Sequence, residues 1–197
     1  MPSPEPPEAA SVILLRDSSP FQILMVARNP AGRVMGGVWV FPGGRVEERD
    51  GGGEGRLRAA ALRELAEETA ITGLATGDLV AFSRWIAPVG LPVRFDTHFF
   101  LARAPDGQEP VVDGVECVDA GWFTAAQMLE LEQEGSFPLL FPTRAHLERL
   151  RSFASIDALL HFARATTSEP VRPRLRMPGD PGDPLLPGDA GYEAATG

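Results

Sequence analysis

Apolar runs separated by turn-forming residues predict six strands in the first two thirds of the chain. The runs are rich in β-branched and aromatic residues and lie at 11–17, 21–27, 36–44, 79–88, 93–104 and 115–123. Only Ser18, Ser19 and Pro20 separate the first two, as in a hairpin or adjacent strands. The third run ends at Pro42, Gly43 and Gly44. These residues interrupt the hydrogen-bond ladder between strands and permit unusual backbone angles.

Four further segments have the composition or apolar spacing of helices. They lie at 56–70, 124–133, 143–153 and 155–165, and Thr124 is placed to cap the second of them. One helix amid the strands and three after them predict a mixed α+β fold or α/β/α sandwich rather than a regular βαβ repeat. No internal repeat is visible.

The chain of 197 residues, 44% of them hydrophobic, is long enough for one packed domain. We expect residues 1–10, which are acidic and rich in proline, to form a flexible tail, and the domain to span 11–168. Residues 169–197 are rich in Pro, Gly and Asp, which predicts irregular chain. Leu185, Leu186 and Tyr192 are apolar residues through which this segment can lie back over the domain.

The net charge and the types of basic residue exclude several classes of function. A net charge of -9 lacks the broad basic surface of nucleic-acid binders, so no nucleic-acid partner is expected. All 18 basic residues are Arg, which excludes a Walker-type lysine or a Schiff base.

No apolar run reaches the roughly 20 residues of a membrane span, and the N-terminus is unlike a signal peptide, so we expect a cytoplasmic protein. The single cysteine, Cys117, is expected to be a buried thiol.

The stretch "ALRELAEET" crowds Glu64, Glu67 and Glu68 onto one side of the predicted helix. A solvated charged face is the ordinary explanation of such a pattern. However, like charges three and four residues apart repel, and the C-terminal end of a helix prefers cations. Arg63 relieves only part of this repulsion. A hard divalent cation such as Mg²⁺ or Mn²⁺ would remove it, whereas the absence of nearby His or Cys argues against zinc.

The stretches "FPGGRVE" and "RELAEETAI" together resemble the Nudix hydrolases, whose box joins a glycine loop to an R-E-U-x-E-E-x-G-U helix, where U is aliphatic. The helical half matches at Arg63, Glu64, Leu65, Glu67, Glu68 and Ile71. The usual box places a glutamate six residues after the glycine and eight before the arginine. Here Arg63 comes nineteen positions after Gly44, five more than usual, and the position eight residues before Arg63 is occupied by Gly55. Glu47 or Glu54 is the expected substitute, and Ala70 replaces the box glycine.

The resemblance implies an α/β/α sandwich with a mixed sheet, on which the box helix packs through Leu62 and Leu65 with Trp39 and Phe41 helping to cover it. It also implies a hydrolase that uses Mg²⁺ or Mn²⁺ to cleave a diphosphate. The implied site residues are Glu68 as metal ligand, Glu64 as ligand or base, Glu67 as ligand directly or through water, a backbone carbonyl of the Gly43 to Gly44 turn, and Arg63 as the residue that orients the glutamates. Glu116 is either a later carboxylate of the site or a solvated strand residue.

The segments "RWIAP", "RFDTHFFLA" and "GGVWVFPGG" resemble a Nudix subgroup that includes peroxisomal coenzyme A diphosphatases. The resemblance implies coenzyme A or acyl-coenzyme A as substrate, with Arg33, Arg84 and Arg94 as phosphate clamps or, alternatively, structural ion pairs. For Arg94 the expected ion-pair partner is Asp96. ADP-ribose, another nucleotide sugar or a dinucleotide is the alternative substrate. A non-catalytic metabolite-binding Nudix domain and a diphosphate isomerase are rival functions, and a homodimer is common in the family.

Overall fold

The computed structural model describes residues 5–32, 35–53, 55–167, 169–177 and 182–195. Its strands are β1 (Glu8–Arg16), β2 (Gln22–Arg28), β3 (Trp39–Val40), β4 (Gly43–Arg45), β5 (Val80–Ile86), β6 (Asp96–Arg103) and β7 (Cys117–Phe123). Its α-helices are α1 (Gly55–Thr69), α2 (Ala125–Gln133), α3 (Phe141–Leu150) and α4 (Ile156–Ala165). Short 3-10 turns lie at Glu48–Asp50, Thr76–Asp78 and Tyr192–Ala194.

The strands form one mixed sheet at the centre of the molecule. Its main path runs β3-β2-β1-β6-β5, while β4 pairs with the start of β1 and β7 pairs with β2. β1 and β6 are parallel, and the other strand pairs are antiparallel. β1 and β2 form the expected antiparallel pair, but β1 begins at Glu8, so its first three residues extend the sheet into the segment expected to be a tail.

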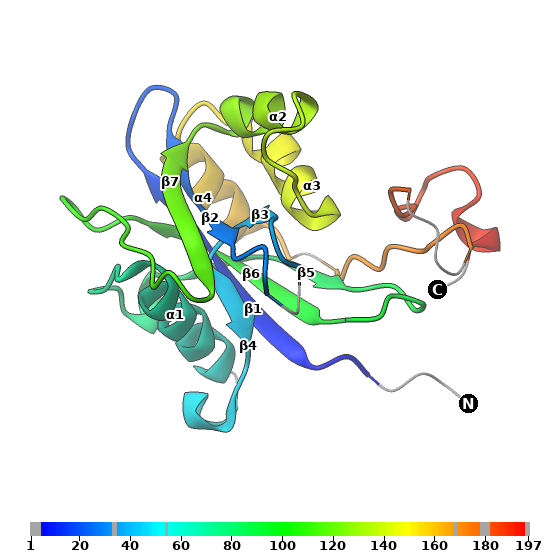
Figure 1. Cartoon of the computed structure of the whole chain (residues 1–197), viewed down its shortest axis with the longest axis horizontal. Coiled ribbons are helices and arrows are strands. Elements are labelled where there is room, and N and C mark those ends of the chain that lie inside the picture. The colour runs from blue at the N-terminus through cyan, green and yellow to red at the C-terminus, as the bar shows by residue number, and fades with distance from the viewer. Residues whose placement is uncertain (1–4, 33–34, 54, 168, 178–181, 196–197) are drawn as a thin grey trace.

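Helices cover both faces of this sheet (Figure 1), with α1 on one face and α2, α3 and α4 on the other. Alternate residues of β1 supply the two cores: Val12 and Leu14 pack toward α1, and Ile13 and Leu15 pack toward the other helices. The α/β/α sandwich with a mixed sheet is therefore confirmed.

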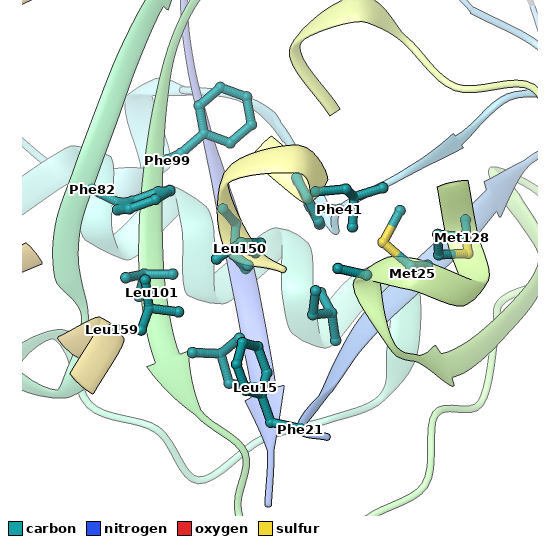
Figure 2. Packing of buried hydrophobic residues seen from close by; sticks show 14 of the residues in the cluster. Leu15, Phe21, Met25, Phe41, Phe82, Phe99, Leu101, Met128, Leu150 and Leu159 are labelled. Atoms are coloured by element: carbon teal, nitrogen blue, oxygen red, sulfur yellow. The ribbon is translucent and has the colours of Figure 1, made fainter. Parts of the chain in front are cut away.

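The larger core contains most of the aromatic residues (Figure 2). Trp39 and Phe41 belong to this core, so the expectation that they help to cover α1 is wrong. Trp39 stacks on Phe137 with ring centroids 4.3 Å apart, and Phe41 meets Phe99 edge-on. Residues two apart along extended chain share one face, and here that face is the one covered by α3, because Phe41 also meets the His146 ring of α3. Leu65 of α1, by contrast, is buried in the core between α1 and the sheet, as expected, and Leu62 of the same helix is partly buried against that core.

The glycine turn also differs from expectation. The single strand expected over 36–44 is divided into β3 and β4, and Gly43 and Gly44 pair with Ser11 and Ala10 of β1 instead of ending the ladder. The later helices follow their sequence signals more closely. Thr124 caps α2 through a hydrogen bond that its hydroxyl accepts from the Gln127 amide, and Ser155 caps α4 in the same way.

The C-terminal segment lies along β5, at the edge of the sheet (Figure 1). Val171 donates its amide hydrogen to the Arg84 carbonyl and accepts a hydrogen bond from the Ile86 amide at its own carbonyl. Leu175 and Leu185 are buried. In the part of the chain that the structure describes, no helix combines the length and hydropathy needed to cross a membrane.

Candidate active site

The glycine turn and α1 approach one another closely at the start of β1. A side chain at Gly44 would place its Cβ 2.5 Å from the carboxyl carbon of Glu64, and one at Gly43 would meet the Ala10 carbonyl oxygen at 2.5 Å. Both distances are too short for any side chain. Glycine at position 44 therefore allows β4 to lie directly against the Glu64 carboxylate of α1, and glycine at position 43 allows it to lie directly against β1.

Glu68 is the most deeply buried of the three box glutamates, with only 2% of its surface exposed. Its Oε2 accepts a hydrogen bond of 2.9 Å from the Gly43 amide. Its Oε1 lies 3.5 Å from Nη1 of Arg28, outside good hydrogen-bonding geometry, and is buried without a hydrogen-bond partner. Burial raises the pKa of Glu68 to about 7, because the Gly43 amide and Arg28 only partly offset the lost hydration.

Arg63 forms hydrogen bonds with two of the three box glutamates. Its Nη1 lies 2.8 Å from Glu64 Oε1 and 3.0 Å from Glu67 Oε2, and its Nη2 donates to the Arg45 carbonyl. Glu64 is also largely buried, and this burial raises the pKa of its carboxyl against the lowering effect of Arg63. Glu67 is exposed at the rim of the cluster. The structure thus brings Arg63, Glu64, Glu67 and the Gly44 backbone together, as the sequence predicts.

The carboxylate that holds Arg63 from the glycine loop is Asp50. It accepts two hydrogen bonds from the guanidinium, from Nε to Oδ1 at 2.7 Å and from Nη2 to Oδ2 at 3.0 Å. These bonds hold the pKa of Asp50 below its usual range. Of the two residues expected to substitute here, Glu47 pairs with Arg49 instead, and Glu54 lies outside the described residues.

The signal for Asp50 was present in the sequence. Counted forward from Gly44, residue 50 stands six residues on, at the box position of the first glutamate. Counting back from Arg63 instead crosses the five extra residues and leads to Gly55. Asp50 also accepts a hydrogen bond from the Glu47 amide, so a 3-10 turn fixes its carboxylate before the extra residues begin.

Residues of the β2 and β7 pair lie behind Glu68. Arg28 and Cys117 are partners across the two strands. Cys117 is buried as predicted, and burial, together with the neighbouring Glu68 charge, raises the pKa of its thiol to about 12. Glu116 is near enough to Glu64 for its charge to raise the pKa of the Glu64 carboxyl, although its own side chain is exposed.

The carboxylate oxygens of the box glutamates are suitable ligands for a hard cation. Among the described residues no three acidic, His or Cys side chains converge on one point, and Arg63 engages Glu64 and Glu67. However, Glu68 Oε1 is a buried carboxylate oxygen with no hydrogen-bond partner, and Glu64 and Glu67 supply further carboxylate oxygens. Such oxygen donors match the preferences of Mg²⁺ and Mn²⁺. These residues therefore fit a divalent ion chemically.

The three arginines expected to clamp phosphate have different surroundings. Arg84 is held by Asp96 through two hydrogen bonds, Nε to Oδ1 at 2.9 Å and Nη2 to Oδ2 at 2.6 Å. Asp96 is thus the partner of Arg84 across the β5 and β6 pair, and not the partner expected for Arg94. Arg94 donates from Nε to the Ala87 carbonyl and lines a small pocket. Arg33 lies outside the described residues.

The fold and the glutamate helix define a Nudix-type domain. A family model described as "NUDIX domain" matches residues 5–141, which include the whole sheet, the glycine turn and α1. The chain belongs to the NUDIX domain family.

The chain is similar to other proteins of this family at low sequence identity. "Putative nudix hydrolase 7" from Caenorhabditis elegans is 25% identical over 185 residues, covering 76% of this chain, which spans only 62% of that protein's length. A crystal structure of a NUDIX hydrolase from Alicyclobacillus acidocaldarius is 26% identical with a TM-score of 0.72, over 84% of this chain and 98% of that one. The NUDIX domain of Shewanella oneidensis NrtR, solved with ADP ribose, is 20% identical with a TM-score of 0.59, over 76% and 88% of the two chains. At that identity the last similarity shows the fold alone.

Proposed function

We propose that this protein is a divalent-metal-dependent hydrolase that cleaves the diphosphate linkage of a nucleoside diphosphate derivative. The observation that carries the proposal is Glu68, whose buried carboxylate has one oxygen without a hydrogen-bond partner and a pKa raised to about 7. A carboxylate in this state is unfavourable for folding and suited to binding a cation. Membership of the NUDIX family and the hydrolases among its relatives support the same activity.

The proposed ligands are Glu68, Glu64, Glu67 and the Gly44 carbonyl, with Mg²⁺ or Mn²⁺ as the ion. The bound ion would neutralise the diphosphate and lower the pKa of a water molecule. Glu64 is a ligand or the base that holds the proton of the attacking water. Burial raises its pKa, which makes it a stronger base than an exposed glutamate. Arg63, fixed by Asp50, orients Glu64 and Glu67 from outside the ligand set.

Coenzyme A or an acyl derivative is the proposed substrate, cut at its diphosphate to 3',5'-ADP and a phosphopantetheine product. The support is the resemblance of the segments around Arg84 and Arg94, together with the position of Arg94 at a pocket. Arg84 binds Asp96 through Nε and Nη2, so only its Nη1 is outside that pair and suited to a phosphate. ADP-ribose is the competing substrate for the same chemistry.

The test is a panel of diphosphates incubated with Mn²⁺ or Mg²⁺ and assayed for phosphate-containing products. Coenzyme A, acyl-coenzyme A and ADP-ribose should be compared by kcat/KM. A tenfold preference for ADP-ribose, about 1.4 kcal/mol in transition-state binding, would remove the coenzyme A assignment. Absence of turnover on every member, despite saturable Mn²⁺ binding measured by calorimetry, would favour a binding-only domain instead.

A further inference from the structure

An arginine outside the proposed ligand set contacts one of the box glutamates. Arg49 belongs to the 3-10 turn Glu48–Asp50, which follows β4 and lies beside α1 (Figure 1). Its Nη1 reaches across to α1 and lies 3.3 Å from Oε1 of Glu67. Its Nε lies 2.7 Å from Oε2 of Glu47, at the start of the turn. Arg49 therefore connects the loop after β4 to one of the proposed metal ligands.

Both oxygens of the Glu67 carboxylate are engaged by arginines. Oε1 pairs with Arg49, and Oε2 accepts a hydrogen bond of 3.0 Å from Nη1 of Arg63. A guanidinium and a divalent cation on the same carboxylate repel one another. Coordination of a metal ion by Glu67 therefore favours the departure of one of the two arginines.

Of these two arginines, Arg49 is the one that can leave. Arg63 has only 14% of its side chain exposed, and it also donates to Asp50 and Glu64. The side chain of Arg49 is 56% exposed, and its partner Glu67 is 46% exposed. Ion pairs exposed to this extent are weak, because solvent screens them and two long side chains must be held in one geometry.

The backbone of Arg49 is nevertheless fixed beside the glutamates. Two hydrogen bonds close the 3-10 turn around it, from the Asp50 amide to the Glu47 carbonyl at 3.1 Å and from the Gly51 amide to the Glu48 carbonyl at 3.2 Å. A guanidinium released from its carboxylate therefore stays within one side-chain length of the cluster. It remains where the negative charge of a diphosphate has to arrive.

We propose that Arg49 binds a phosphate group of the substrate when a metal ion occupies the glutamates, and pairs with Glu67 until then. The planar guanidinium fork matches phosphate oxygens through paired hydrogen bonds. The exchange replaces one anionic partner of Arg49 by another, so its charge is paired in both states. The identity of the second partner rests on the proposed function, because a nucleoside diphosphate derivative supplies the phosphate.

The first experiment is calorimetric titration of metal-free protein with Mn²⁺ in the absence of substrate. We expect Arg49→Gln to tighten Mn²⁺ binding at least threefold, because Glu67 then has one competitor fewer. Arg45→Gln is the matched control and should change the affinity less. Arg45 is an exposed arginine of β4, and among the described residues its guanidinium forms no ion pair. An effect of Arg49→Gln below threefold, or one that Arg45→Gln equals, would overturn the proposal.

The second experiment measures the phosphate contact with α,β-methylene-ADP, a nucleoside diphosphate whose bridge cannot be hydrolysed, titrated into Mn²⁺-saturated protein. We expect saturable binding, weakened about tenfold in Arg49→Gln and unchanged in Arg164→Gln. Arg164 is an exposed arginine of α4, on the other face of the sheet, so it controls for the loss of one charge. Arg49→Lys keeps the charge without the fork and should bind with intermediate affinity. A loss in Arg49→Gln no greater than in Arg164→Gln, or no binding by the wild type, would overturn the phosphate assignment.

Both titrations measure binding alone, so failure of the proposed hydrolase activity leaves them interpretable. If the protein turns over coenzyme A or ADP-ribose, Arg49→Gln at saturating Mn²⁺ should raise KM about tenfold and change kcat less than twofold. This division distinguishes a phosphate contact from damage to the glutamates, which would lower kcat. A lower kcat at constant KM would contradict the role of Arg49.

Discussion

Glu68 links protonation, metal binding and stability at a single side chain. Its pKa is raised from about 4.5 to about 7 in the folded state. In the metal-free protein, the contribution of Glu68 to the free energy of unfolding is therefore greatest below pH 4.5, where the carboxyl is protonated in both states. This contribution is lost as the pH rises through 7, because the buried carboxyl then ionises. Glu68→Gln should lack this loss and be more stable than the wild type by about 1–3 kcal/mol at pH 8 in EDTA. Urea unfolding at pH 5 and pH 8 measures the difference.

The same variant should bind Mn²⁺ weakly and turn over substrate orders of magnitude more slowly, while its circular dichroism spectrum is unchanged. Glu134→Gln is a suitable control, because Glu134 is an exposed glutamate at the end of α2. Near-normal kcat of Glu68→Gln at saturating metal would show that Glu68 is not a ligand.

Asp50 acts on the site through Arg63. Asp50→Asn removes the charge of the bidentate pair and should leave Arg63 less well held against Glu64 and Glu67. We expect kcat to fall about 10- to 100-fold, a loss comparable to one charged hydrogen bond of about 1.5–3 kcal/mol. Asp50→Glu should recover most of the activity, and Glu47→Gln should have little effect. If Glu47→Gln were the more damaging variant, Asp50 would not be the box carboxylate.

The end of α1 contains a backbone conformation that suits glycine better than the residue present. Ala70 follows the helix with φ of 57°, in the left-handed region, and is exposed. Ala70→Gly should raise the free energy of unfolding by about 0.5–1 kcal/mol, because removal of Cβ strain outweighs the added freedom of the unfolded chain. In the interior of the helix, Ala66→Gly should lower it by a similar amount. Urea midpoints test the opposite signs directly.

Helix α3 is attached to the sheet by a buried histidine. His146 contacts the Ser83 hydroxyl at 2.6 Å and the Pro142 carbonyl at 2.6 Å, and its ring meets Phe99 and Trp85. Burial lowers its pKa from about 6.5 to about 4. The neutral form therefore supports folding fully above pH 6.5, and this support is lost as the pH falls toward 4.

We accordingly expect the wild type to lose about 1.4 kcal/mol of stability per pH unit below 6.5 relative to His146→Gln, whose side chain stays neutral. Unfolding of both proteins by urea between pH 4 and pH 7.5 gives the comparison. Parallel pH profiles would mean that His146 does not titrate in this way.

At the level of the elements, the sequence predicts a feature correctly where the contacts that form it lie between residues close together in the chain. The glutamate helix, the Thr124 cap and the hairpin of β1 and β2 follow from neighbouring residues, and each is present in the structure. The partner of Asp96 depends on the pairing of β5 with β6, where a bulge lies between Ala81 and Ser83, and spacing within one strand does not reveal it. The pocket beside Arg94 is also lined by Arg172, Arg174 and Tyr192, which lie about 80 to 100 positions later, and no pattern in the β6 segment indicates this.

For the molecule as a whole, the C-terminal segment completes the sheet at its β5 edge. Removal of residues 169–197 would leave the Arg84 carbonyl and Ile86 amide without Val171 and would remove the buried side chains of Leu175 and Leu185. We expect a loss of about 2–3 kcal/mol, which lowers Tm by roughly 4–12 °C for a chain of this size. The exposed edge should also cause association at high concentration, detectable by light scattering.

Met177→Ala in the full chain is the matched control, because Met177 belongs to the same segment but is exposed. An unchanged Tm after truncation would show that the segment contributes nothing to the sheet edge.

The extra residues between Asp50 and Arg63 have a practical consequence for engineering. Gly51, Gly52 and Gly53 are exposed, and a Cβ at any of them would have no neighbour within 4 Å. The ion pair between Asp50 and Arg63 closes this loop at its base, so the chain length inside it does not set the distance between the two side chains. Each doubling of a flexible loop costs only about 0.6 kcal/mol. A reporter peptide inserted at Gly52 should therefore leave the ion pair between Asp50 and Arg63, and with it the position of the glutamates, unchanged.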